Sequence, residues 1–336
     1  MNVSPIPTSM RAAVFEADGE PLRIKSVPVP AVRPGEVLVR VQGVGLNPLD
    51  IKIRSGNAAH AAHPAPAILG IDMAGIVEAV GDDVVGFSPG DTVFGMTGGV
   101  GGMQGALAQY ASVDASLLAP APATFSSREA AATPLIFITA WEGLVDRAKV
   151  GPGRTVLVHG GAGGVGHVAI QIALAFGATV YATGKGAQQA IIEALGATFI
   201  DHQRQSVDQY VSLHTDGEGF DIIFDTVGGV TLDASFQAVR RYHGHVVSAL
   251  GWGTHALAPL SFRAGTYSGV FTLLPLLSGR YRAHHGEILR EAKRLADEGH
   301  LKVRVDPRIF VLDTAEDGYR YLESGAANGK VVVELA

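Results

Sequence analysis

The stretch VLVHGGAGGVGHVAIQIALAFGA, residues 156–178, decides the fold because it joins an apolar strand pattern to a helical pattern through a glycine-rich turn. Gly161, Gly163 and Gly166 follow the spacing G-x-G-x-x-G. With 43 glycines in 336 residues, about 0.7 such matches are expected by chance, so the spacing alone means little. Only the surrounding pattern can show that these glycines form a phosphate-binding turn.

Strands and helices alternate throughout this part of the chain. TVLVHG is a continuous apolar strand pattern, and HVAIQIALAF keeps apolar residues on one helical face until Gly177 ends the helix. TVYAT, TFIDH, FDIIFDTVGG and HVVSALG are further strand patterns, and AQQAIIEAL, SVDQYVSLH and TLDASFQAVRR are the helical patterns between them. This alternation predicts an α/β fold with a Rossmann doubly wound parallel sheet over residues 126–262.

The flanking segments show a different pattern of predicted secondary structure. Before residue 125, short β-rich runs such as VLVRVQGVG and AGIVEAVG alternate with Pro-Gly turns, which predicts a β-rich, barrel-like domain over residues 1–125. Residues 263–336 contain one clear helical pattern at 286–298 and end in KVVVEL, which we interpret as a strand returning to the first domain. The glycine-rich segment 95–105 is either a mobile flap or an ordinary loop.

Composition limits the class of partner. The net charge is −6 and no Lys/Arg cluster is present, so the chain lacks the electrostatic footprint of a nucleic-acid or acidic-membrane binder. It has no cysteine and no apolar run long enough to span a bilayer. We therefore expect small-molecule partners, no nucleic-acid or membrane partner, and a cytoplasmic location.

The glycine turn itself indicates a dinucleotide. The first glycine allows the tight turn, the second lets the backbone approach a pyrophosphate, and the third lets the helix pack close to the sheet. A chain that selects NAD carries an acidic residue at the end of the second strand, whereas here that strand ends in YATGKG. Lys185 offers a cation for the 2′-phosphate, so we predict NADPH, with NADH as the alternative if Lys185 is only a solvated surface lysine.

Seven motifs in order resemble the medium-chain dehydrogenase/reductase superfamily, most closely its zinc-free quinone oxidoreductases of the ζ-crystallin type. The motifs are NPLDIKIRSG (47–56), GIDMAGIVEAVG (70–81), PGDTVFG (89–95), GALAQYA (105–111), ITAWEGL (138–144), the glycine turn and NGKVVVEL (328–335). The resemblance implies a GroES-like catalytic domain completed by the C-terminal segment, an inserted Rossmann domain, and a homodimer. In this family the third Rossmann strand often ends in a Tyr-Arg pair near the 2′-phosphate, where this chain has His202 and Gln203.

The resemblance also bears on metals. Zinc alcohol dehydrogenases of the superfamily place a Cys, a His and a further Cys at positions that match Asn47, Ile71 and, by a looser alignment, Leu135. These three residues cannot form a normal zinc ligand set. Two histidine pairs, at positions 60 and 63 and at 243 and 245, have no acidic or thiol partner nearby, so we predict no metal site.

The candidate site residues follow from the turn and from the family pattern. Asn47 is the candidate for contacting substrate or the nicotinamide ribose, with a turn residue before Pro48 as the alternative. Asp50 is expected to be a buried structural carboxylate, with orientation of a cofactor or loop group as the alternative. Arg54 is expected to be a packing or domain-bridging cation, with substrate contact as the alternative. The predicted cofactor-binding residues are Thr139, Gly161, Ala162, Gly163, Gly164, Val165, Gly166, Thr183, Gly184, Lys185, Leu250, Gly251 and Asn328.

The chemistry that fits a zinc-free nicotinamide site is reduction of a conjugated acceptor. Without a metal to polarise a carbonyl, a quinone or an α,β-unsaturated carbonyl is the better hydride acceptor because it delocalises the developing charge. We therefore predict an NADPH-dependent, zinc-independent reductase of quinones or enones. The alternatives are an alcohol or aldehyde dehydrogenase of the same superfamily and a nucleotide-binding protein without turnover.

Overall fold

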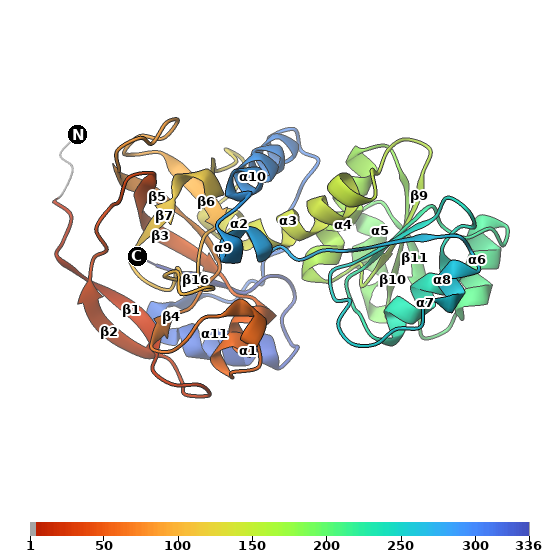
Figure 1. The fold of residues 1–336 in the computed structure, drawn as a ribbon, viewed down its shortest axis with the longest axis horizontal. Coiled ribbons are helices and arrows are strands. Elements are labelled where there is room, and N and C mark those ends of the chain that lie inside the picture. Colours follow the sequence, from red (N-terminus) through yellow and green to blue (C-terminus); the bar gives the residue numbers. More distant parts are fainter. Residues whose placement is uncertain (1–4, 336) are drawn as a thin grey trace. The chain divides into compact units, whose positions relative to one another are not determined.

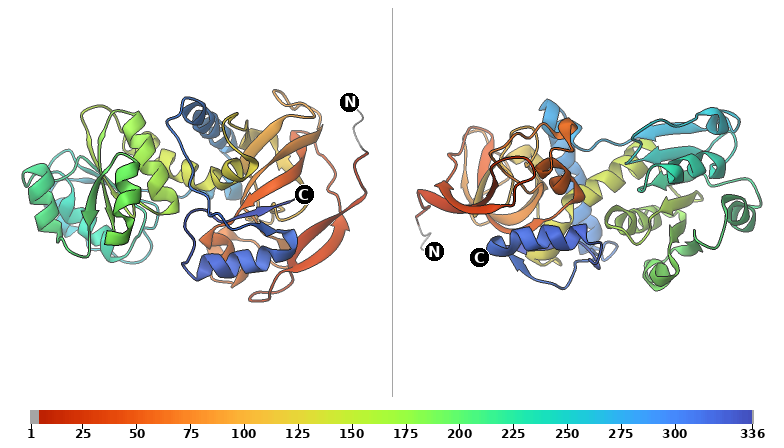
Figure 2. Two further views of the ribbon diagram at one scale, coloured as in Figure 1. Left: turned by 180° about the vertical axis from the view of Figure 1, so that it is seen from behind. Right: turned by 90° about the horizontal axis from the view of Figure 1, so that it is seen from below.

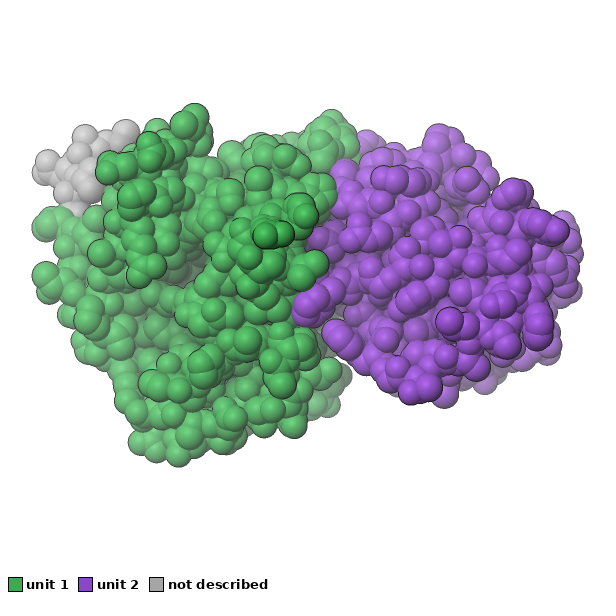
Figure 3. Space-filling model, in the orientation of Figure 1, with its two compact units in different colours: residues 1–135, 273–298, 303–336 green, residues 136–272, 299–302 purple. Residues whose placement is uncertain are grey.

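The computed structural model describes residues 5–335 and divides the chain into two compact units (Figure 3). Unit 1 comprises residues 1–135, 273–298 and 303–336, and unit 2 comprises residues 136–272 and 299–302. The first boundary lies ten residues after the expected position of 125/126. The second, at 272/273, lies ten residues after the expected 262/263.

Unit 1 is built from two sheets of largely antiparallel strands. A three-stranded sheet has the order β2-β1-β4, and a seven-stranded sheet has the order β15-β16-β3-β5-β6-β8 with β7 also paired to β3. The strands are β1 (Ser9–Phe15), β2 (Arg23–Pro28), β3 (Glu36–Gly45), β4 (Ala67–Ile68), β5 (Asp72–Val80), β6 (Thr92–Met96), β7 (Tyr110–Asp114), β8 (Leu118–Pro120), β15 (Phe310–Val311) and β16 (Val332–Glu334). The β-rich domain predicted for the N-terminal part is therefore confirmed.

The strand β3 is the centre of unit 1 because it pairs with three others. It is antiparallel to β5, β7 and β16, and Val44 lies opposite Val333. The predicted return of KVVVEL to the first domain is thus observed, and Figure 2 shows the blue C-terminal chain among the red and orange strands. This pairing places Lys330 beside the end of β3, where its side chain reaches Asn47.

Short helices fill the spaces around these sheets. The helix α2 begins with a capping box between Ser126 and Glu129 and packs on β3, while α10 packs on β8. The helical segments are α1 (Pro48–Arg54), η1 (Ala59–Ala61), η2 (Ala115–Leu117), α2 (Ser127–Ala132), α9 (Leu274–Ser278), α10 (Arg282–Asp297), η5 (Leu312–Thr314) and α11 (Ala315–Glu323). The predicted helix at 286–298 is α10, which begins four residues earlier.

Unit 2 contains one six-stranded parallel sheet in the order β11-β10-β9-β12-β13-β14. The chain starts at β9, moves outward through β10 and β11, and then crosses to β12, β13 and β14 on the other side, which is the Rossmann order. The strands are β9 (Thr155–His159), β10 (Thr179–Gly184), β11 (Thr198–Asp201), β12 (Ile222–Asp225), β13 (His245–Ser248) and β14 (Thr266–Gly269). The predicted doubly wound sheet is confirmed.

The edge strand β14 was not recognised in the sequence. Its residues, TYSG, are mostly exposed and carry no apolar alternation, so the period-two signal of a half-buried strand is missing. It nevertheless pairs with β13 through the register of His245 with Thr266 and Ser248 with Gly269. This strand extends unit 2 beyond residue 262.

Helices pack on the sheet of unit 2 as the alternation predicts (Figure 1). The helix α4 packs on β9 and β10, α5 packs on β11, and α7 packs on β12 and β13. The helical segments are α3 (Pro134–Trp141), which begins in unit 1, the π-helical η3 (Glu142–Arg147), α4 (Gly164–Ala175), η4 (Gly186–Gln188), α5 (Gln189–Ala194), α6 (Val207–Thr215), α7 (Val230–Ala238) and α8 (Ala258–Ser261). No helix in residues 5–335 has the length and apolar character needed to cross a membrane.

Candidate functional site

The glycine-rich turn lies between the carboxyl end of β9 and the start of α4. Gly160 has a φ of 72°, and its N–H donates to Thr183 Oγ1 at 3.2 Å. The Gly161 N–H donates to the Thr183 carbonyl at 2.9 Å, and the Gly163 N–H donates back to the Gly160 carbonyl at 2.9 Å. The turn is therefore held in one conformation by the neighbouring strand β10.

The three motif glycines meet different demands. A Cβ at Gly166 would lie 2.1 Å from the Gly160 carbonyl oxygen, and a Cβ at Gly161 would lie 2.6 Å from Ala182 Cβ, so both positions exclude any larger residue. A Cβ at Gly163 would meet only the Gly160 carbonyl oxygen, at 3.1 Å, and Gly163 is exposed. The middle glycine thus leaves open surface at the tip of the turn.

The start of α4 completes an anion-binding turn. Gly163 is the N-cap residue, and Gly164 beside it is exposed. The first-turn N–H groups of a helix have no partner within the helix, and its N-terminus carries partial positive charge. The main chain of Gly163, Gly164 and Val165 can therefore hold a pyrophosphate, as the motif predicts.

The end of β10 carries the residues expected to distinguish the two cofactors. Thr183 is 3% exposed, and its hydroxyl is engaged by Gly160 and by His159 Nδ1 at 3.1 Å, so it holds the turn from within. Lys185 is exposed. Asp201 at the end of β11 lies alongside, because a Cβ at Gly186 would be 3.4 Å from Asp201 Oδ2. One cation and one carboxylate therefore stand at this edge.

A row of buried polar side chains crosses the carboxyl edge of the sheet, and of its four members sequence reasoning predicted only Thr183. His159, Asp225 and Ser248 are the last residues of β9, β12 and β13, and Thr183 is the last but one of β10. His159 lies opposite Asp225, which lies opposite Ser248. Burial lowers the pKa of His159 to about 4, with the charge of Asp225 opposing the shift, so its imidazole is neutral. The available signal was a polar residue ending each apolar strand pattern.

The remaining predicted cofactor residues lie in two places. Leu250 and Gly251 follow β13, and a Cβ at Gly251 would lie 2.1 Å from Tyr267 Oη, so this glycine allows close packing. Thr139 is 6% exposed on α3 in unit 2. Asn328 belongs to unit 1, is exposed, and its Oδ1 accepts from Arg304 Nη2 at 2.5 Å. The contacts of these residues with a cofactor stay predictions.

Asn47 in unit 1 belongs to a buried ion network formed with Asp72 and Lys330. Its Nδ2 donates to Asp72 Oδ2 at 3.0 Å and to the Gly45 carbonyl at 3.2 Å, and its Oδ1 accepts from Lys330 Nζ at 2.5 Å. Asn47 is only 1% exposed. Its amide is therefore already occupied by the protein, whereas the predicted contact with substrate stays a prediction.

Lys330 is the cation of this network. Its Nζ also donates to the Leu46 carbonyl at 3.0 Å and lies 3.7 Å from Asp72 Oδ2. Asp72 Oδ1 accepts the N–H of Leu135 at 2.8 Å, so the three positions matched to zinc ligands by resemblance come together around Asp72. Lys330 was missed because it lies 283 residues from Asn47.

Burial shifts the pKa values of the ionisable groups in this network and of Asp50 beside it. Burial raises the pKa of Asp50 to about 7, a hydrogen bond from the Asn47 N–H opposes the rise, and the charge of Asp72 adds to it. Burial likewise raises the pKa of Asp72 to about 6, against the charge of Lys330. Burial lowers the pKa of Lys330, and the charge of Asp72 opposes this shift. The network is thus sensitive to pH near neutrality.

Asp50 and Arg54, the first buried and the second part-buried on α1, make contacts close to the ion network. Asp50 is fully buried, and its Oδ2 accepts the Asn47 N–H at 2.9 Å, which closes the first turn of α1. Arg54 pairs with Glu316 at 2.6 Å and lies over the Tyr319 ring at 5.7 Å from its centroid. These contacts are of the kind that structural groups make, and all of them lie within unit 1.

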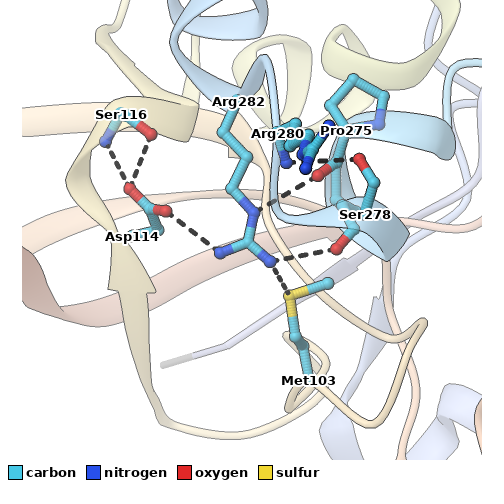
Figure 4. Close-up of polar contacts among 8 residues, drawn as sticks. Met103, Asp114, Ser116, Pro275, Ser278, Arg280 and Arg282 are labelled. Atoms are coloured by element: carbon cyan, nitrogen blue, oxygen red, sulfur yellow. Dashed lines mark hydrogen bonds and ion pairs between the residues drawn. The ribbon is translucent and has the colours of Figure 1, made fainter.

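The glycine-rich segment 95–105 is held by the rest of unit 1. Val100 is fully buried, and the N–H groups of Gly101 and Gly105 donate to Ala61 and Ile68. At its end, Met103 Sδ lies 3.3 Å from Arg282 Nη2. Figure 4 shows the Arg282 guanidinium reaching this sulfur, Asp114 and backbone carbonyls of α9, which are those of Pro275 and Leu276. These contacts describe an anchored loop.

Comparison with known protein families matches both parts of the chain. Residues 33–123 match the model described as "Alcohol dehydrogenase GroES-like domain", and residues 195–333 match the model described as "Zinc-binding dehydrogenase". The first match covers a β-rich part of unit 1 that includes Asn47 and Asp72 of the buried ion network. The second runs from the middle of unit 2 through β16.

Curated relatives align over nearly the whole chain. The "2-methylene-furan-3-one reductase" of Solanum lycopersicum is 34% identical over 339 residues, covering 98% of this chain and 80% of that protein. The "NADPH-dependent alkenal/one oxidoreductase, chloroplastic" of Arabidopsis thaliana is 32% identical over 339 residues, with the same coverage.

Solved structures show the same two-part fold. The "alcohol dehydrogenase superfamily protein" from Novosphingobium aromaticivorans is 53% identical with a TM-score of 0.95, covering 97% of this chain and 100% of that one. The "quinone oxidoreductase from Coxiella burnetii" is 28% identical with a TM-score of 0.81, covering 98% of this chain and 100% of that one.

Proposed function

This chain belongs to the medium-chain dehydrogenase/reductase superfamily, in its quinone and enone reductase branch, and we propose that it transfers hydride from NADPH to quinones or α,β-unsaturated carbonyls without zinc. The observation that carries this proposal is the open glycine turn at the start of α4, in a chain whose full-length relatives are named as reductases of conjugated carbonyls.

The residues of unit 2 suit a dinucleotide. The exposed main chain of Gly163, Gly164 and Val165 would hold the pyrophosphate, and the closed packing at Gly161 and Gly166 keeps the turn in shape. When bound, NADPH supplies the hydride. The protein's own task is to hold the nicotinamide against the acceptor and to exclude competing reactions.

NADPH rather than NADH is supported by Lys185 and by the name of one relative. Lys185 stands exposed at the end of β10, where a carboxylate would bind the ribose hydroxyl of NAD. Asp201 beside Gly186 works against this preference, because its charge would repel a 2′-phosphate. We assign the selectivity to the balance between these two side chains.

The residues around position 47 do not suit zinc, although one matching family model is described as zinc-binding. Asn47 offers an amide already bonded to Lys330 and Asp72, and Ile71 offers no donor atom. The Lys330 ammonium would repel a divalent cation placed against the same two residues. Among residues 5–335, no three His, Cys, Asp or Glu side chains gather as a metal site.

The test is the initial rate of NADPH oxidation by chelator-treated protein with quinones, enones, saturated aldehydes and ketones. Turnover confined to quinones and enones is the expected result, and parallel rates with NADH measure the cofactor preference. Turnover of saturated carbonyls alone would favour the alcohol or aldehyde dehydrogenase alternative. Tight NADPH binding without any turnover would favour a nucleotide-binding protein.

We also propose that the enzyme is a cytoplasmic homodimer whose partner is a second copy of the chain. The absence of cysteine suits a reducing compartment. The mostly exposed edge strand β14, with Tyr267 38% exposed and Phe262 87% exposed before it, offers unpaired main chain and apolar surface for the second copy. Light scattering should give twice the chain mass, and a monomer would contradict the proposal.

A further inference from the structure

The strand β12 ends in a buried carboxylate that holds the loop after it. Asp225 is fully buried, and it accepts the N–H groups of Val227 and Gly228, both at 3.0 Å, and the hydroxyl of Ser248 at 2.7 Å. The loop it holds contains Gly228 and Gly229, which have φ values of 78° and 55°. This backbone conformation suits only glycine without strain, so the loop has a definite shape.

The same carboxylate reaches a second loop through Ser248. The Ser248 hydroxyl, which donates to Asp225, also accepts the Leu250 N–H at 3.1 Å. The two loops touch, because a Cβ at Gly228 would lie 2.6 Å from the Leu250 carbonyl oxygen. Asp225 and Ser248 therefore fix the loops after β12 and β13 as one unit.

These loops belong to one half of the sheet. In a doubly wound sheet the strand order reverses at the first strand, and each half binds one nucleotide of the dinucleotide at its carboxyl ends. Here β9, β10 and β11 form the half that contains the glycine turn and Lys185, whereas β12, β13 and β14 form the other. By this rule the loops held by Asp225 would lie beside the nicotinamide half of a bound dinucleotide.

We propose that Asp225 is a positioning residue for the nicotinamide half of the cofactor, acting through Ser248 and the loops at 226–229 and 249–251. It shapes these loops before the cofactor binds, without touching the cofactor itself. The inference rests on the proposed use of NADPH, and it concerns binding rather than the acceptor reduced.

The same strand provides a matched control at its other end. Asp221 precedes β12, and its side chain is 4% exposed. It accepts the N–H and hydroxyl of Thr155, at 2.8 and 2.9 Å, and pairs with Arg240 at 2.5 Å. Its contacts resemble those of Asp225 in number, but they lie at the amino edge, away from the edge where ligands bind.

The experiment compares Asp225→Ala and Asp221→Ala in the full chain. Dissociation constants are measured for NADPH and for 2′,5′-ADP, which contains only the adenine half, together with the melting temperature. We expect Asp225→Ala to weaken NADPH about tenfold or more and 2′,5′-ADP less than about twofold, since each stranded buried donor costs free energy on this scale. Asp221→Ala should lower the melting temperature while leaving both constants within about twofold.

Three results would overturn the inference: unchanged NADPH affinity in Asp225→Ala, an equal loss of both ligands, or an equal NADPH loss in Asp221→Ala. If Asp225→Ala does not fold, Ser248→Ala serves instead: it removes the bonds to Asp225 and Leu250, leaves the bonds from Asp225 to Val227 and Gly228, and should weaken NADPH about threefold with the same selectivity. Unchanged NADPH affinity in that variant would also overturn it. Turnover by the wild type is measured separately. The inference about Asp225 can therefore fail while the proposed reaction is supported, and the proposed reaction can fail while the inference about Asp225 is supported.

Discussion

Replacing Asp50 by asparagine should change how the stability of the protein depends on pH. Asp50 is fully buried, and burial raises its pKa to about 7 from the ordinary value of 3.8. The folded protein therefore keeps a proton on this carboxyl at pH values where the unfolded chain has released it. Because the folded state binds more protons, the contribution of Asp50 to stability is full below the unfolded pKa and is lost as the pH rises toward about 7.

The size of the effect follows from the two pKa values. The whole shift corresponds to about 4 kcal/mol, and the part that falls between about pH 5 and pH 8 is about 2.5 kcal/mol. Asparagine keeps an oxygen that can accept the Asn47 N–H but does not ionise. The free energy of unfolding of Asp50→Asn, relative to wild type, should therefore rise by about 2.5 kcal/mol across this range.

The difference between the two proteins is the quantity to measure, because other groups titrate in the same range. Asp72, with a pKa raised to about 6, acts in the same direction as Asp50. His159, with a pKa lowered to about 4, acts in the opposite direction, since it is the unfolded imidazole that binds the extra proton. The contribution of His159 is common to wild type and variant and cancels in the difference, whereas the charge of Asp72 is coupled to Asp50, so the measured difference includes this coupling.

Urea unfolding followed by far-ultraviolet circular dichroism is the suitable assay, because both tryptophans, Trp141 and Trp252, lie in unit 2 and report poorly on Asp50. Asp82→Asn, at an exposed position in the same unit, serves as the matched control. A difference between Asp50→Asn and wild type that stays constant within about 0.5 kcal/mol from pH 5 to pH 8 would refute the reasoning.

Three further predictions concern the cofactor turn and the ion network. Gly166→Ala should weaken NADPH binding at least about tenfold, since its Cβ would fall 2.1 Å from the Gly160 carbonyl oxygen; isothermal titration with unchanged affinity would contradict this. Lys185→Glu should raise the KM for NADPH more than that for NADH, and equal increases would show that Lys185 does not contact the 2′-phosphate. Lys330→Met should cost about 3–5 kcal/mol in chemical denaturation by leaving Asp72 without its cation, and adding Asp72→Asn should recover most of the loss. If Lys330→Met alone is as stable as wild type, Lys330 and Asp72 are not coupled.

Local patterns in the sequence were sufficient for the architecture. Each strand of unit 2 except β14 is a short apolar run, and each helix ends at a glycine or a polar segment, so the Rossmann order follows from alternation and handedness. The glycine turn was predictable for the same reason, because its steric demands act between neighbours in the sequence or on the adjacent strand.

The polar side-chain contacts of the site were harder to predict from the sequence. Thr183 reads as a cofactor contact from its place at the end of β10, but its hydroxyl holds Gly160 and His159. Asp225 and Ser248 stand 23 residues apart, and only the parallel register of β12 with β13 brings them within hydrogen-bonding distance. Side-chain partners in a parallel sheet depend on register, which an apolar run does not specify.

The sequence by itself determined the two-part architecture, the glycine turn and the exclusion of cysteine-based chemistry, because these depend on composition and on short-range periodicity. Only the tertiary structure decided that Lys330 would reach Asn47 and Asp72 and that polar strand ends would line up beneath the cofactor edge. The physical reason is that buried charges and hydroxyls must find partners wherever the chain returns, and that return is set by the pairing of β16 with β3 and by the order of the parallel sheet.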